Sequence, residues 1–155
     1  MFDYWQKQIT SKPLYPEIEW EKPTRKDIAG KLLIIGGSTG SFSGVADAYA
    51  TSKAAEIGEV KAVIPETLRK PTKDLPDIMY APSNTSGSFS TKSKEILLYS
   101  SQWADGVLLS GEYGRNSESA IALAYLIKNY KGLVKINENY LWLSNVQMEN
   151  LQHHP

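Results

Sequence analysis

Two glycine-rich loops are the stretches of this chain whose residue types could do chemistry. The first, GGSTG at residues 36–40, directly follows an apolar run at residues 31–35. A strand, a glycine turn and a helix together point backbone N–H groups and a helix N-terminus at an anion. Glycine suits that turn because a Cβ would block close approach and forbid positive φ. The pattern is neither GxGxxG nor GxxxxGK[ST], so a tight turn without a ligand explains it about equally well.

The second loop, SGEYGR at residues 110–115, follows another apolar run, GVLL at residues 106–109. Ligands of open α/β sheets bind outside the carboxyl ends of the strands. Both glycine loops fall at such ends. We therefore expect them to face one crevice, and we expect a phosphorylated small molecule or nucleotide to bind between residues 36–44 and 110–115.

Alternating apolar runs and helical patterns position these loops. Strands are expected at residues 31–35, 60–64, 78–81, 106–109 and 133–136, and helices at residues 43–58, 91–103 and 117–131. This alternation at these spacings fits right-handed βαβ crossovers. The sequence therefore predicts an α/β fold with a mostly parallel sheet and flanking helices.

Helix ends and buried faces can also be predicted. Ser41 or Ser43 is expected to cap the first helix, and Asn116 or Ser117 the last one. Gly58 suits the position just after the first helix. The expected buried face of the first helix comprises Val45, Ala46, Tyr49, Ala50, Ala54 and Ile57, and that of the second Ile96, Leu97, Tyr99 and Trp103.

Length and composition narrow the class of protein. The chain has 155 residues, which corresponds to one domain, with an aromatic and proline-marked arm at residues 1–30 and a single α/β domain at 31–155. Seventeen basic residues balance seventeen acidic ones, so binding to a nucleic acid is not expected. Cysteine is absent, and no spaced His/Asp set suggests a metal site. No signal peptide or membrane span is recognisable, so a cytoplasmic location is expected.

The stretch KLLIIGGSTGSFSGVADAYATSKAAEIGEVKAVIPETL, at residues 31–68, resembles the opening of the NAD(P)H-hydrate dehydratases, a ribokinase-like family related to carbohydrate kinases. That family shows a strand, GGS, a short loop and then G-A-x-x-L-A. A second match, ADGVLLSGEYGRNSES at residues 104–119, is similar to the family's A-D-A-V-x-I-G-P-G-L-G-R-D. The resemblance covers roughly residues 28–145 and fades through LVKINENYLWLS, where the family has L-V-L-D-A-D-A-L.

The resemblance implies a repair enzyme for hydrated NADH or NADPH that uses ADP or ATP with Mg²⁺. The nucleotide would phosphorylate the substrate hydroxyl, and loss of phosphate would restore the double bond, a reaction that depends on positioning and charge neutralisation. With the loops, the resemblance gives these expected ligand-binding residues: Gly36, Gly37, Ser38, Gly40, Gly44, Val45, Gly111, Glu112, Tyr113 and Gly114. Asn137, Asn139 and His154 are further candidates, and no catalytic residue is assigned.

Several positions depart from the family pattern. Glu112 stands where the family has the substrate-contacting glycine of G-P-G, and a carboxylate there would repel a phosphorylated substrate. Asn137 and Asn139 stand where the family has paired aspartates. The family's later G-x-G-D segment is absent, so a truncated ribokinase-like fold is expected.

Three functional hypotheses stay open on the sequence. The first is an ADP- or ATP-dependent NAD(P)H-hydrate dehydratase, a lyase. The second is a non-catalytic nucleotide- or phosphate-ligand-binding or assembly domain derived from that fold, with no cofactor of its own. The third is a plain structural α/β domain whose glycine loops are only turns. The apolar arm and an exposed sheet edge also predict a homo-oligomer, or a complementing second half.

Overall fold

One five-stranded sheet forms the centre of the molecule. The computed structural model describes residues 11, 16, 21, 23–73 and 75–137. Most of the predicted arm at residues 1–30, and the candidates Asn139 and His154, therefore lie outside the described residues. The strands are β1 (Lys31–Gly36), β2 (Glu59–Pro65), β3 (Ile78–Ala81), β4 (Gly106–Gly111) and β5 (Leu133–Ile136). They pair in the order β3-β2-β1-β4-β5, and all four pairings are parallel. The predicted α/β class with a mostly parallel sheet is confirmed.

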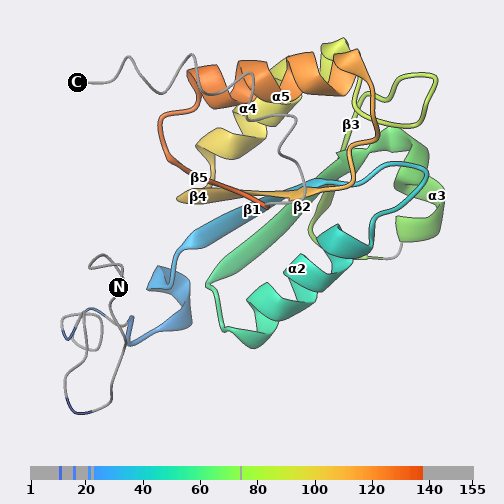
Figure 1. The fold of residues 1–155 in the computed structure, drawn as a ribbon. Helices are drawn as coiled ribbons and strands as arrows, with labels where there is room; N and C mark the ends of the chain where they lie inside the picture. The colour runs from blue at the N-terminus through green and yellow to red at the C-terminus, as the bar shows by residue number, and fades with distance from the viewer. Residues whose placement is uncertain (1–10, 12–15, 17–20, 22, 74, 138–155) are drawn as a thin grey trace, which may run out of the picture.

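Helices cover both faces of this sheet (Figure 1). On one face lies α2 (Ser43–Ala54), with the short segments η2 (Glu66–Leu68) and α3 (Arg69–Thr72) beyond the end of β2. On the other face lie α4 (Lys94–Gln102), which follows η3 (Thr91–Ser93), and α5 (Ser117–Asn129). A 3-10 turn, η1 (Lys26–Ile28), precedes β1.

The central strands β1, β2 and β4 are largely apolar because both faces of the sheet are buried there. Successive side chains of a strand point to opposite faces, and β1 follows this rule. Leu33 and Ile35 belong to the core under α4 and α5, whereas Ile34 belongs to the core under α2. All three are 0% exposed. Each face therefore has its own apolar core, and the sheet is held between them.

The helix α2 corrects two expectations. It ends at Ala54, and the positive φ of the exit falls on Glu56 (58°) and not on Gly58. Gly58 is needed for another reason, because a Cβ there would lie 2.7 Å from the backbone oxygen of Gly30. The expected small-residue face is also wrong, since Ala46, Ala50 and Ala54 are exposed. Val45, Tyr49 and Ile57 pack on the core as predicted, and Ala48 and Ser52 are the further inward-facing residues.

In α4, one expected core residue faces outward. Leu97 is 0% exposed, and Ile96 and Trp103 are partly buried, as predicted. Tyr99, however, is 76% exposed. Buried positions at Leu97, Ser100 and Ser101 show that the inward face passes through two serines, which an apolar pattern does not reveal. Asn116 caps α5 as predicted, since its side chain accepts a hydrogen bond from the backbone N–H of Ser119 (2.9 Å).

The strand order contains a topological switch point between β1 and β4. From β1 the chain first adds β2 and β3 on one side, and then crosses back to add β4 and β5 on the other. In open parallel sheets the loops that leave such neighbouring strands diverge, and ligands bind in the crevice between them. The ribokinase-like assignment and the truncation stay predictions. No helix in the described part of the chain has the length and apolar character needed to cross a membrane.

Candidate ligand crevice at the ends of β1 and β4

The two glycine loops meet at the switch point. The backbone N–H of Gly37, just after β1, donates a hydrogen bond to the backbone oxygen of Gly111 at the end of β4 (2.9 Å). Both loops therefore lie at the same edge of the sheet, as the sequence predicts. Whether a ligand binds there is a separate question, which depends on the space that the loops leave.

The glycines of these loops allow the backbone segments to pack against one another. A Cβ on Gly36 would lie 2.7 Å from the Gly111 oxygen and would also meet the Ser110 hydroxyl. Gly37 has φ of 86°, which favours glycine. A Cβ on Gly44 would lie 3.3 Å from both the Glu112 carboxylate and the Ser110 oxygen. At Gly36 and Gly44, other protein atoms border the space that the absent side chain leaves, so this space is not open to a ligand.

The carboxylate of Glu112 occupies the anion position at the start of α2. One oxygen accepts a hydrogen bond from the backbone N–H of Gly44 (2.8 Å), and the other accepts from the Ser43 hydroxyl (2.9 Å) and from the Ser41 hydroxyl. The N-cap residue of α2 is Phe42, which makes no side-chain cap bond. Neither Ser41 nor Ser43 caps the helix as expected, because their hydroxyls turn toward Glu112. A carboxylate from a distant loop does the capping.

These contacts keep Glu112 ionised. Partial burial alone would raise the pKa of Glu112, but hydrogen bonds from Ser41, Ser43 and the backbone at Ser43 and Gly44 bring it below its ordinary value of 4.5. Glu112 itself adopts φ of 63°, a conformation that residues other than glycine seldom adopt. The carboxylate is thus held in place at some conformational cost, and that cost is offset by a charge-assisted cap.

Tyr113 belongs to the core beneath the crevice. Its side chain is 0% exposed, and its hydroxyl donates to the backbone oxygen of Ile35 (3.1 Å). Its ring centroid lies 6.3 Å from that of Phe89. Val45 and Ser38 are also buried, at 4% and 7% exposed. These three predicted site residues lie at the crevice, but their side chains support the loops from within.

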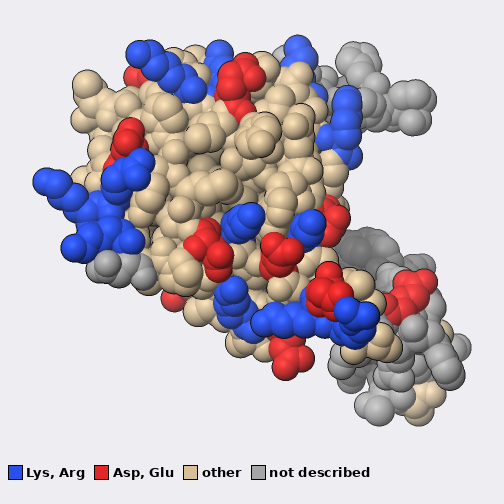
Figure 2. Space-filling model, turned by 180° about the vertical axis from the view of Figure 1, so that it is seen from behind, with Lys and Arg blue, Asp and Glu red and all other residues tan. Residues whose placement is uncertain are grey.

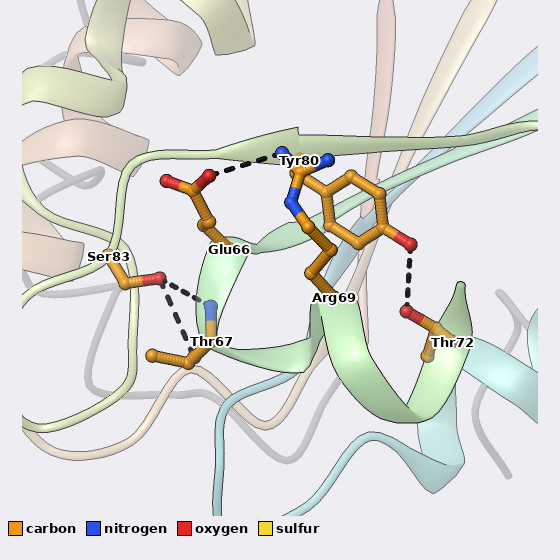
Figure 3. A network of polar contacts seen from close by, with 6 residues as sticks. All are labelled: Glu66, Thr67, Arg69, Thr72, Tyr80 and Ser83. Atoms are coloured by element: carbon orange, nitrogen blue, oxygen red, sulfur yellow. Dashed lines mark hydrogen bonds and ion pairs between the residues drawn. The ribbon is translucent and has the colours of Figure 1, made fainter.

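A third loop closes over the first two, and sequence reasoning missed it as part of the site. Gly87, in the loop after β3, accepts hydrogen bonds at its backbone oxygen from the N–H of Thr39 (2.9 Å) and from the Thr67 hydroxyl (3.1 Å). Thr67 in turn donates its N–H to Ser83 (3.0 Å; Figure 3). The polar composition of residues 83–90 with one glycine is the only sequence signal, and it also describes an ordinary loop.

The remaining described candidates lie at the same edge. A Cβ on Gly114, whose φ is 68°, would lie 2.7 Å from the Ser88 hydroxyl, so this loop also contacts the third one. Asn137 follows β5 and donates its side-chain amide to the Ser110 oxygen (3.4 Å). Gly40 is exposed at the tip of its loop. The structure therefore brings together every predicted site residue that it describes.

The residues present do not fit a phosphate at the start of α2. A phosphate of ADP or ATP would need the N–H of Gly44 and the hydroxyls of Ser41 and Ser43, which already bind the Glu112 carboxylate. The two anions would repel each other at that distance. Within the described residues there is no group of three or more His, Cys, Asp and Glu that could hold a metal ion.

A hollow near the crevice is lined mainly by apolar residues. It has a volume of about 180 Å³ and lies beneath α2, where Phe42, Val45 and Tyr49 face Ile64 and Ile78. Val45 is the only predicted site residue in its wall. In comparisons with known proteins, no family model and no curated protein matches this chain.

Proposed function

We propose that this chain is a non-catalytic α/β domain, derived from a fold of the dehydratase type, that acts through protein–protein contacts and not by phosphoryl transfer. One observation carries the proposal: the Glu112 carboxylate accepts the hydrogen bonds of Ser41, Ser43 and Gly44, which are the groups that a phosphate would use. An anion site of the ancestral kind is thus filled by the chain's own side chain.

The charge of this carboxylate argues against phosphoryl transfer. Enzymes of that class must neutralise the negative charge that spreads over the transferred group. Glu112 adds a negative charge at the helix terminus that would otherwise provide neutralisation, and its lowered pKa keeps it ionised near neutral pH. Asn137 offers an amide where the resemblance expects an aspartate, and an amide cannot serve as a general base.

An assembly role is supported by apolar surface outside the crevice. Leu75, near the start of β3, is 53% exposed, and Tyr99 on α4 is 76% exposed. Seen from behind, the molecule has a broad uncharged area with basic and acidic side chains at its margins (Figure 2). Large exposed apolar side chains such as Leu75 and Tyr99 are of the kind that protein interfaces bury.

The direct test is incubation with hydrated NADH, Mg²⁺ and either ADP or ATP, with recovery of NADH absorbance as the readout. We expect no recovery. We also expect inorganic phosphate to leave the thermal unfolding midpoint of the wild-type chain unchanged. Glu112→Gly leaves the hydroxyls of Ser41 and Ser43 and the N–H of Gly44 without the carboxylate, and glycine adopts the positive φ without strain. Phosphate should therefore raise the unfolding midpoint of this variant. Glu112→Gln keeps these groups occupied without the charge and is the matched control, for which no phosphate shift is expected.

A second candidate function is the dehydratase itself, in this chain or with a complementing second half. The observation that favours it is the meeting of the two glycine loops at the switch point, through the Gly37 to Gly111 hydrogen bond. Recovery of NADH absorbance by the wild-type chain would establish that enzyme and overturn the non-catalytic proposal. A phosphate response of the wild-type chain without turnover would instead establish a phosphate-ligand-binding domain.

A further inference from the structure

The outer edge of β3 is unpaired among the described residues. β3 is the terminal strand of the sheet, and only β2 pairs with it. The N–H of Ala62 in β2 donates to the oxygen of Asp77 (2.9 Å), so the backbone groups of alternate residues, Asp77, Met79 and Ala81, face β2. The N–H and C=O groups of Ile78 and Tyr80 therefore point outward. They form a ready template for one more strand.

Two hollows flank this edge, one on each face of the sheet. The hollow of about 180 Å³ under α2 includes Ile78 in its wall. A second hollow, of about 360 Å³, lies on the α4 side and includes Met79, Tyr99 and Trp103. Leu75 and Tyr99, two of the exposed large apolar residues, stand next to these hollows. The sheet is thus incompletely covered beside β3 on both faces.

The opposite edge differs. Strand β5 carries Lys135, and a lysine on an edge strand discourages pairing with another chain. Strand β3 has the sequence IMYA and no charged residue. Of the two sheet edges that the described residues form, the β3 edge is therefore the more suitable one for pairing with a strand of another chain.

Charged pairs stand at both ends of β3 and fit a two-fold arrangement. At its carboxyl end, Arg69 lies over the ring of Tyr80 (4.2 Å) and pairs with Glu66 (3.1 Å; Figure 3). At its amino end, Lys53 pairs with Asp77 (3.5 Å). A two-fold axis through the middle of the strand brings the carboxyl end of one copy to the amino end of the other. The Glu66–Arg69 pair of one copy then lies beside the Lys53–Asp77 pair of the other, so the charges brought together at each end sum to zero and no unbalanced like charges meet.

We propose that two copies of this chain pair through their β3 strands, antiparallel and centred on Met79, to form a continuous ten-stranded sheet. In this register Ile78 of one copy exchanges backbone hydrogen bonds with Tyr80 of the other, and the two Met79 residues face each other as a non-hydrogen-bonded pair. Ile78 and Tyr80 share the α2 face, and Met79 lies on the α4 face, so apolar side chains meet on both faces. This inference deepens the proposed function, because it names the partner of the assembly domain.

The absence of cysteine allows a direct test of the register. In an antiparallel non-hydrogen-bonded pair the Cα atoms are about 4.5 Å apart, which falls within the range that a disulfide spans. Met79→Cys should therefore give a covalent dimer under mild oxidation of the full chain. Leu133→Cys, on the exposed edge residue of β5, is the matched control and should stay monomeric on a non-reducing gel. An efficient cross-link in the control but not at position 79 would overturn the proposal.

The mass in solution tests the assembly without cross-linking. Light scattering of the wild-type chain should give twice 17.3 kDa, and Met79→Lys should give 17.3 kDa with an unchanged circular dichroism spectrum. Leu133→Lys should remain a dimer. A wild-type monomer, or a dimer that survives Met79→Lys, would overturn the edge pairing but leave the closed crevice untouched. Turnover of hydrated NADH by a dimer would overturn the proposed function and leave the edge pairing in place.

Discussion

Two regions of the same sheet differ in whether their backbone polar groups have hydrogen-bond partners within the chain. At the carboxyl ends of β1 and β4, backbone and side-chain groups find partners inside the chain, as in the Gly37 to Gly111 bond and the capping of α2 by Glu112. At the outer edge of β3, backbone groups of Ile78 and Tyr80 point away from the sheet, and apolar side chains around them are partly exposed.

The comparison shows that a stretch can stand out in the sequence without providing a surface on which a ligand can bind. Glycine loops attract attention because they permit close approach, yet here the approaching group is another loop of the same chain. Strand β3 is short and ordinary in sequence, yet it leaves a polar backbone edge and two hollows unfilled. Where polar groups already have hydrogen-bond partners within the chain, a ligand adds little binding free energy. At the unpaired β3 edge, a partner strand adds both hydrogen bonds and burial of apolar surface.

The largest effect is expected from Gly36→Ala. The new Cβ would lie 2.7 Å from the Gly111 backbone oxygen, and backbone cannot move aside as a side chain can. We expect a loss of about 3 kcal/mol in the free energy of unfolding, at the upper end for overpacking. Urea denaturation measures it. Gly40→Ala is the control, since its Cβ would meet only the Ser38 hydroxyl at 3.8 Å, and it should change stability by less than about 0.5 kcal/mol. Equal stabilities would mean that the loops are not closely packed.

A smaller, pH-dependent effect is expected from Glu112→Gln. Because folding lowers the pKa of Glu112 below its ordinary value of 4.5, its ionised form stabilises the fold above that pH, and this contribution disappears as the pH falls through the lower folded pKa. The variant should be less stable than the wild type by about 1 kcal/mol at pH 7, typical of a lost charged cap. Parallel urea titrations from pH 7 to pH 3 should show the two stabilities converging in acid. A difference that does not depend on pH would show that the charge of Glu112 does not stabilise α2.

Tyr113→Phe should have an effect of similar or smaller size, about 0.5–1 kcal/mol. It removes the hydroxyl that donates to the buried Ile35 oxygen, but the Ser110 hydroxyl still donates to the same oxygen (3.2 Å). Denaturation in urea measures the change, and it should be independent of pH between 5 and 8. A gain of phosphate binding in this variant would contradict the assignment of Tyr113 to the core.

The fold was largely predictable from sequence because its strands are short, mostly apolar runs bounded by glycine and proline residues. The run at residues 31–35 and the cap at Asn116 are examples, each with a local physical cause. The meeting of the glycine loops also followed from topology alone. The contacts that a side chain makes with residues far away in the sequence could not be predicted. Glu112 caps a helix 68 residues away, and no local pattern encodes that contact. The buried face of α4 was misjudged for a related reason, because Ser100 and Ser101 pack inward while Tyr99 faces out.

The smallest effect on folding, and the sharpest separation of the two regions, is expected from Tyr99→Ser. Tyr99 is 76% exposed beside Met79, so its loss should change the unfolding free energy of the monomeric Met79→Lys background by less than about 0.5 kcal/mol. Serine and tyrosine have similar helix propensities, which keeps α4 intact. In the symmetric dimer both Tyr99 rings gain burial against the opposite copy, together worth about 1.4 kcal/mol, so the dissociation constant should rise about tenfold. Sedimentation over a dilution series measures it. An unchanged dissociation constant would place the partner elsewhere than on the α4 side of β3, and a destabilised monomer would mean that Tyr99 supports the core of its own chain.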